Sequence, residues 1–161
     1  MTEPPADILR RLRPIPARVG PPTTPPRDVV GVSPEGADCR VVVEQGADPV
    51  LLLFLSAGCT GCRDLWEGLA ELRAGLGDAA RLAVVTRSPG DEDPSAIALL
   101  AGDATQKLGV AVVMSSSAFR DYGVGGPPFL ALATPDAVRT ESVAWGVEQT
   151  LHTALAALGR G

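Results

Sequence analysis

Two cysteines separated by two residues are the side chains best suited to chemistry in this sequence. Cys59 and Cys62, with Thr60 and Gly61 between them, lie one helical turn apart, so their sulfur atoms can form a disulfide. A cysteine at the start of a helix faces unpaired backbone N–H groups and the positive end of the helix dipole, which favour the thiolate. The position therefore predicts Cys59 as the nucleophile and Cys62 as the resolving thiol that attacks the mixed disulfide. This exchange needs no cofactor.

The cysteine pattern leaves other interpretations open. The pair could be two small buried residues without reactivity, or part of a zinc or copper site with Cys39 and His152 as further ligands. No second C-x-x-C and no nearby histidine completes a tetrahedral set, so we expect no metal. Cys39 is expected to be a small core residue, and His152 a surface or packed imidazole. Arg63 adds a positive charge beside the pair, and we expect it to face solvent.

The elements that must position the pair are a buried strand and a helix. Residues 50–55 are continuously apolar, as in a strand covered on both faces, and they end just before the cysteines. Leucines at positions 65, 69, 72 and 76 predict one amphipathic helix after them. Further strands are predicted at 39–44, 81–86, 110–114, 129–133 and 138–144. Further helical segments are predicted at 95–101, 115–122 and 147–158.

These elements together predict one α/β domain at residues 35–161. Parallel strands joined by helices, followed by a hairpin and a terminal helix, predict a mixed four- or five-stranded sheet with helices on both faces. Residues 1–34 are rich in proline and predict an N-terminal arm, with a short helix at 6–13.

Charge and hydropathy exclude two classes of partner. The net charge of −5 would repel a phosphate backbone, so no nucleic acid is expected. No apolar run approaches the roughly 20 residues needed to cross a bilayer. The first residues are charged and lack the apolar stretch of a secretion signal, so we expect a cytoplasmic protein. The alternative is the extracytoplasmic domain of a protein anchored by a preceding segment.

Two segments carry a resemblance to a known family. Residues 52–63 (LLFLSAGCTGCR) and 122–130 (YGVGGPPFL) resemble the two signature segments of the thioredoxin superfamily. Over roughly residues 39–158 the chain is most similar to its redoxin or TlpA branch, and the approach to the cysteines is similar to that of MauD-type proteins. The resemblance implies a thioredoxin-like fold and disulfide exchange with protein thiols, disulfides and a reducing or oxidising partner protein.

The resemblance also implies which residues meet the substrate. Pro128 would be the cis-proline facing the disulfide, with Pro127 before it. Thr60, Gly61 and both prolines would then contact the substrate, an extended segment of which would pair with the loop in the manner of a β-strand.

The chain departs from the thioredoxin pattern at several positions. Gly58 stands where thioredoxins have tryptophan, and Thr60-Gly61 replaces their Gly-Pro dipeptide. The buried acid that assists proton transfer in thioredoxins is Leu53 here, which leaves Glu44, Glu67 or water for that task. MauD-like and TlpA-like proteins also usually act outside the cytoplasm, which conflicts with the expected location.

A second function from another class is a thioredoxin-like binding module that uses its groove without turnover. Exposed tryptophans at Trp66 or Trp145 would suit such a module, although both are more often core anchors. A peroxidase is less favoured, because no threonine-proline setting precedes Cys59.

Overall fold

The centre of the fold is a mixed sheet of seven strands. A computed structural model of the chain describes residues 24–46 and 48–159. Within them the strands follow the order β2-β1-β5-β4-β3-β6-β7. The strands are β1 (Val29–Val32), β2 (Asp38–Val41), β3 (Val50–Phe54), β4 (Arg81–Thr86), β5 (Ala111–Met114), β6 (Phe129–Ala133) and β7 (Val138–Val143). The α/β class is confirmed, whereas the predicted count of four or five strands is wrong.

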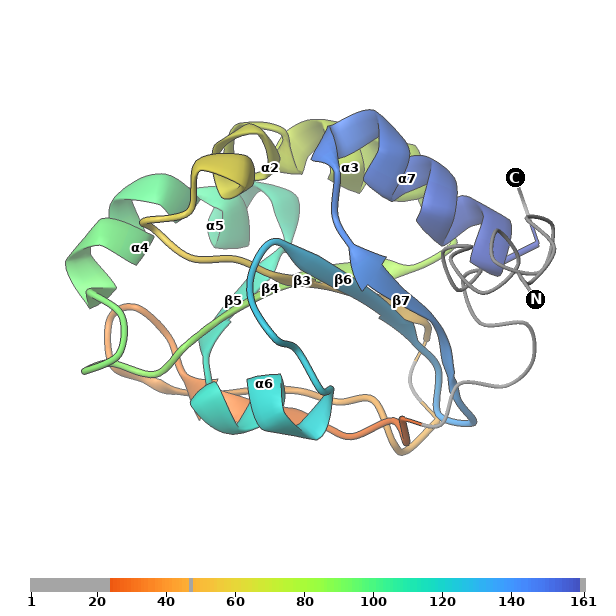
Figure 1. The fold of residues 1–161 in the computed structure, drawn as a ribbon, viewed down its shortest axis with the longest axis horizontal. Coiled ribbons are helices and arrows are strands. Elements are labelled where there is room, and N and C mark those ends of the chain that lie inside the picture. The colour runs from red at the N-terminus through yellow and green to blue at the C-terminus, as the bar shows by residue number, and fades with distance from the viewer. Residues whose placement is uncertain (1–23, 47, 160–161) are drawn as a thin grey trace, which may run out of the picture.

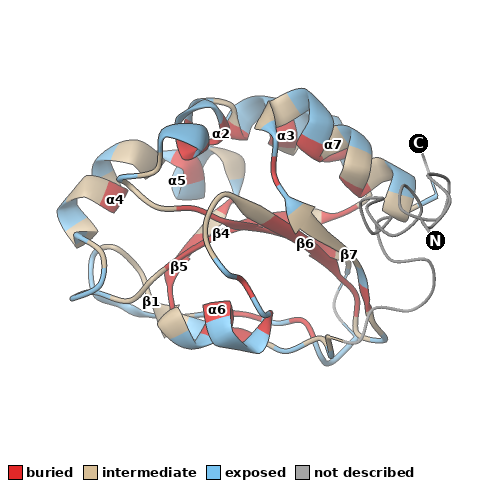
Figure 2. Cartoon of the chain, viewed as in Figure 1, coloured by how far each residue is buried: buried red, intermediate tan, exposed pale blue. Residues whose placement is uncertain are grey.

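The middle of the sheet is built from the apolar runs of the sequence. β3 pairs in parallel with β4, β4 pairs in parallel with β5, and β6 runs antiparallel to β3. All five residues of β3 are buried, because helices or loops cover both faces. Alternate residues face opposite sides of a strand. Leu51 and Leu53 accordingly join one apolar cluster, and Leu52 and Phe54 join the other. Figure 2 shows the buried residues in red along the middle of the sheet.

Two strands extend the sheet at its β5 edge: β1, which was not predicted, and β2, which overlaps the strand predicted at 39–44. β1 pairs with β2 along four residues and joins β5 through Val32 and Met114. A side chain on Gly31 would overlap the carbonyl oxygen of Met114, so glycine allows the backbone of β1 to approach β5. β1 has only four residues and follows a proline-rich segment, so its sequence pattern was too short to stand out.

The described part of the predicted arm is fixed to the domain. The Tyr122 hydroxyl accepts a hydrogen bond from the backbone N–H of Arg27 at 3.0 Å and donates one to the carbonyl of the same residue. Two residues further on, Val29 is completely buried in β1. Residues 24–34 therefore pack with the sheet, and residues 1–23, with the predicted helix at 6–13, lie outside the described residues.

Helices lie on both faces of the sheet, as predicted (Figure 1). They are the 3₁₀ turn η1 (Thr60–Cys62) and the helices α2 (Arg63–Glu67), α3 (Leu69–Leu76), α4 (Pro94–Ala101), α5 (Ala104–Leu108), α6 (Ser116–Asp121) and α7 (Gly146–Ala157). The helix α6 covers one face, and the larger helical layer with α2, α3 and α7 covers the other. The short helix α5 was not predicted.

The single helix predicted after the cysteines is divided at Gly68. Gly68 lies between α2 and α3 with φ −97° and ψ 13°. Helical hydrogen bonds still continue across this joint, because the N–H of Gly68 donates to the carbonyl of Asp64 and the carbonyl of Gly68 accepts from the N–H of Leu72. A Cβ atom at Gly68 would overlap Cγ2 of Val147 on α7 and lie 3.0 Å from the Asp64 carbonyl oxygen. Glycine at this joint therefore permits α7 to pack closely against α2 and α3, the helices that follow Cys62.

Candidate functional site

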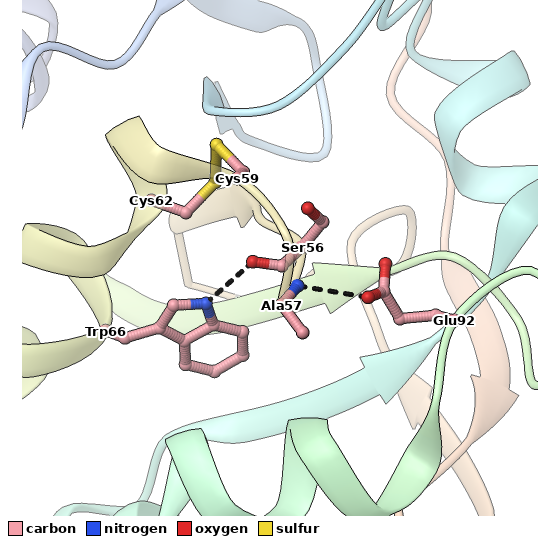
Figure 3. The surroundings of a disulfide bond; sticks show 6 residues. All are labelled: Ser56, Ala57, Cys59, Cys62, Trp66 and Glu92. Carbon is pink, nitrogen blue, oxygen red and sulfur yellow. Dashed lines mark hydrogen bonds between the residues drawn. A yellow bond between two sulfur atoms is a disulfide. The ribbon is translucent and has the colours of Figure 1, made fainter.

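The cysteine pair lies at the edge of the sheet where the parallel strands end. β3 ends at Phe54, and the N–H of Leu55 still bonds to the carbonyl of Val85 on β4 at 2.9 Å. Cys59 follows in an extended conformation and leads into η1. The two cysteines form a disulfide with a Cα–Cα separation of 5.2 Å, as the spacing predicted (Figure 3).

The two sulfur-bearing residues differ in their access to solvent. Cys62 is completely buried in the apolar cluster beneath the larger helical layer, together with Leu65 and Trp66 of α2. Cys59 is only partly buried and lies at the rim of that cluster. An incoming thiol or disulfide can therefore reach Cys59, whereas Cys62 can be reached from Cys59.

Two hydrogen bonds fix the loop that precedes Cys59. Nε1 of Trp66 donates to the carbonyl of Ser56 at 3.1 Å, and the N–H of Ala57 donates to Oε1 of Glu92 at 3.0 Å (Figure 3). Glu92 comes from the loop after β4, so the next strand of the sheet anchors the loop carrying the nucleophile candidate. The sequence analysis missed Glu92, because its partner lies 35 residues away.

The acids considered as replacements for the thioredoxin carboxyl group have other surroundings. Oε2 of Glu44 accepts from the N–H of Asp28 at 3.2 Å, and Glu67 is exposed on α2. Neither forms a hydrogen bond with the cysteines within the described part of the chain. Glu92 is the acid that contacts the loop leading to Cys59.

The proline-containing loop lies against the cysteine turn. The peptide bond between Pro127 and Pro128 is cis, the form that the resemblance implied. A Cβ atom on Gly61 would contact Cδ and Cγ of Pro128 at 3.5 Å, so the two residues lie side by side. The carbonyl of Pro128 accepts from the N–H of Ala144 at 3.2 Å, which joins the loop to the segment before α7. The structure thus brings together the two segments on which the resemblance depends.

Other residues singled out in the sequence lie away from the pair or in solvent. Cys39 is partly buried in β2 and packs on the opposite face of the sheet from Cys62, so these two thiols do not share a metal site. Burial raises the pKa of the Cys39 thiol. His152 is exposed on α7, and Arg63 is exposed as expected.

The two tryptophans have opposite environments. Trp66 is 5 % exposed and is a core anchor. Trp145 is 73 % exposed and directly follows Ala144, the residue that bonds to Pro128. A large apolar ring therefore stands in solvent beside the proline-containing loop.

No helix among the described residues is both long and apolar enough to cross a membrane.

Comparisons with known proteins find structural likeness only. Neither the family models nor the curated proteins gave a match to the chain. A thiol:disulfide interchange protein of the thioredoxin family from Chlorobium tepidum superposes with a TM-score of 0.65 and 16 % identity, covering 89 % of this chain and 100 % of the other. A secreted disulfide oxidoreductase from Mycobacterium tuberculosis, homologous to DsbE, superposes with a TM-score of 0.60 and 15 % identity, covering 81 % of this chain and 93 % of the other.

The likeness also extends to a peroxidoxin. BcpB from Mycobacterium tuberculosis has a TM-score of 0.62 and 16 % identity, covering 88 % of this chain and 97 % of the other. At this level of identity the matches establish a thioredoxin-like fold. The function of this protein must be argued from the residues at the site.

Proposed function

We propose that this protein is a thiol–disulfide oxidoreductase that exchanges disulfides with protein partners through Cys59 and Cys62. The observation that carries the proposal is the asymmetry of the pair: Cys59 is accessible at the rim, and Cys62 is buried one turn further on. A nucleophile must reach its substrate, whereas a resolving thiol must reach only the mixed disulfide.

The reduction of a substrate disulfide proceeds in two exchanges. The Cys59 thiolate attacks one substrate sulfur, which forms a mixed disulfide and releases the other substrate sulfur as a thiolate. The Cys62 thiolate then attacks Cys59, which closes the disulfide seen in the structure and releases the second substrate thiolate. Two electrons pass to the substrate, and the reverse sequence oxidises a dithiol.

The residues around the pair support docking of a polypeptide. We assign substrate contact to Thr60 and Gly61 in the cysteine turn and to Pro127 and Pro128 in the facing loop. Thr60 is exposed, and the contact between Gly61 and Pro128 leaves both loops at the same surface. The exposed ring of Trp145 adds apolar area next to them.

The likeness to a secreted oxidoreductase bears on the partners. We favour the extracytoplasmic alternative over the cytoplasmic location expected from the sequence, with substrates drawn from proteins that carry thiols or disulfides. The MauD-like subfamily remains a prediction.

Trapping of mixed disulfides tests the proposal. Cys62→Ser should accumulate a covalent complex with a disulfide-containing substrate such as insulin, because Cys59 attacks and nothing resolves the product. Cys59→Ser should form no complex, and Cys39→Ser, the matched control, should reduce insulin at the wild-type rate. Equal trapping by Cys59→Ser and Cys62→Ser would refute the assigned roles.

The same variants separate the oxidoreductase from a binding module. Reduced wild-type protein should reduce insulin, and iodoacetamide should label Cys59 faster than an unstructured thiol. A binding module would retain its partner in all variants without turnover. Absence of both insulin reduction and exchange with dithiothreitol would favour that alternative.

A further inference from the structure

A cavity of about 610 Å³ opens at the same edge of the sheet as the disulfide. Residues that line it include Arg87, Asp91, Ser116, Phe119, Arg120 and Gly125. Arg87 directly follows β4, and Ser116 begins α6 just after β5. Because β3, β4 and β5 are neighbouring parallel strands, the residues that follow them meet at one edge.

Two connections join this cavity to the cysteine site. Gly125 lies two residues before Pro127, so the loop that faces the disulfide also forms part of the cavity wall. Figure 1 shows this loop running from α6 to the start of β6. On the other side, Asp91 lines the cavity, and its neighbour Glu92 holds Ala57 before Cys59.

Hydrogen bonds fix the walls of the cavity. The N–H of Ser88 donates to Oγ of Ser116 at 2.8 Å, and the N–H of Ser116 donates to Oγ of Ser88 at 2.9 Å. Oγ of Ser116 also donates to Oδ2 of Asp91 at 2.9 Å. The loop after β4 is thereby tied to α6, and the cavity does not depend on a ligand for its shape.

The charges in the cavity favour an anion. The guanidinium carbon of Arg87 lies 4.4 Å from the centre of the Phe119 ring, which orients its side chain. Neither Arg87 nor Arg120 forms an ion pair within residues 24–46 and 48–159. Asp91 is the one carboxylate in the lining, and Ser116 already donates to it.

Other arginines of the chain are engaged differently. Arg40 pairs with Asp28 at 3.6 Å, and Arg73 and Arg81 donate to backbone carbonyls. Two cations face one anion in the cavity of a chain whose overall charge is −5. A guanidinium group binds a carboxylate through paired N–H donors.

We propose that this cavity binds an acidic side chain of the polypeptide substrate, close in sequence to the cysteine that reacts with Cys59. The inference rests on the proposed function and adds a substrate preference to it. A polypeptide that docks along Pro127 and Pro128 passes the mouth of the cavity, because Gly125 belongs both to the loop with these prolines and to the lining of the cavity. Arg120 and Arg87 would then select Asp or Glu over neutral residues.

Exchange with paired peptides tests the inference. Both peptides of a pair carry one cysteine in a mixed disulfide, and they differ only in having Glu or Gln at one position. That position is moved stepwise along both sides of the cysteine in successive pairs. At the position that reaches the cavity, wild-type protein should react about fivefold faster with the Glu peptide, equivalent to about 1 kcal/mol for a partly exposed charge pair. The preference should fall as salt is raised.

Charge-removing variants locate the source of the preference. Arg120→Gln, at an exposed position, should bring the Glu-to-Gln rate ratio close to one, and Arg87→Gln should lower it. Arg139→Gln is the matched control, because it removes the same charge from an exposed residue near the start of β7, at the end of the sheet away from the disulfide. The control should retain the ratio.

The outcomes separate this inference from the proposed function. Exchange without a Glu preference at any position would refute the cavity assignment alone. A preference that persists in Arg120→Gln and Arg87→Gln, or that Arg139→Gln abolishes equally, would also refute it. No reaction of the wild-type protein with any peptide or with dithiothreitol would refute the proposed function, and the inference with it.

Discussion

Replacing Gly68 with alanine tests whether the joint between α2 and α3 sets the position of α7. The added methyl group would overlap Cγ2 of Val147 and lie 3.0 Å from the carbonyl oxygen of Asp64. Val147 is β-branched and has few rotamers available, so it cannot turn away easily. Inserting a methyl group into such a contact costs about 1–3 kcal/mol, and we expect Gly68→Ala to lower the free energy of unfolding by about 2 kcal/mol.

A double-mutant cycle identifies the contact responsible. Val147→Ala removes two partly buried methyl groups and should by itself cost about 1 kcal/mol. In the double variant the methyl group added at position 68 no longer meets Cγ2 of residue 147. The free energy of unfolding should therefore fall by about 1–2 kcal/mol in total, rather than by the sum of about 3. Gly75→Ala is the matched control, since its methyl group would meet the flexible end of Leu151.

Urea unfolding of the oxidised protein measures these differences. With a slope of roughly 2 kcal/mol per molar urea, Gly68→Ala should lower the midpoint by about 1 M, and Gly75→Ala should change it much less. Additive losses in the double variant would refute the argument, because they would mean that Val147 does not limit the space at Gly68. An unchanged midpoint for Gly68→Ala would refute it as well.

Two further substitutions test hydrogen bonds of the fold and of the site. Bonds from two backbone N–H groups, at 2.7 and 2.9 Å, lower the pKa of Asp28, so its contribution to stability is present above the unfolded pKa of about 3.9 and is lost as pH falls through the folded value. Asp28→Asn should therefore lower the free energy of unfolding by about 1–2 kcal/mol relative to wild type at pH 7, and this difference should narrow by pH 3. A difference in stability that does not depend on pH would contradict this. Glu92→Ala removes the acceptor of the Ala57 N–H, whose hydrogen exchange should become about fivefold faster, whereas Glu92→Gln should keep it slow. Equal exchange rates in the two Glu92 variants would show that this bond does not hold the loop.

The parts of the fold that followed from sequence are those with strong apolar patterns. Residues 50–55 and 81–86 have long buried runs and form β3 and β4 within a residue of the predicted bounds. β1 is short, half-exposed and preceded by prolines, so no local pattern marks it, and its place in the sheet depends on contacts with distant strands. The division of the helix at Gly68 likewise depends on Val147, a residue far along the chain.

The same distinction applies to the site. The spacing of Cys59 and Cys62 predicted their disulfide, because local helix geometry determines that distance. The bond from Ala57 to Glu92 and the pairing of Arg87 with Phe119 join segments more than 30 residues apart. A single sequence carries no local signal for such contacts, and the cavity that Arg87 and Phe119 line forms only when the strand ends are assembled.

If a polypeptide pairs with the loop beside the disulfide, as proposed, the two adjacent imino acids limit the hydrogen bonds that it can form there. Neither Pro127 nor Pro128 has a backbone N–H, and the oxygen of Pro128 already accepts from Ala144. The oxygen of Pro127 therefore remains as an acceptor, so a strand lying there can give a hydrogen bond to this dipeptide but receive none from it. One of the two hydrogen bonds that a residue pair exchanges in an antiparallel sheet would therefore be missing. The remaining affinity would have to come from the contacts that the side chains of the bound polypeptide make.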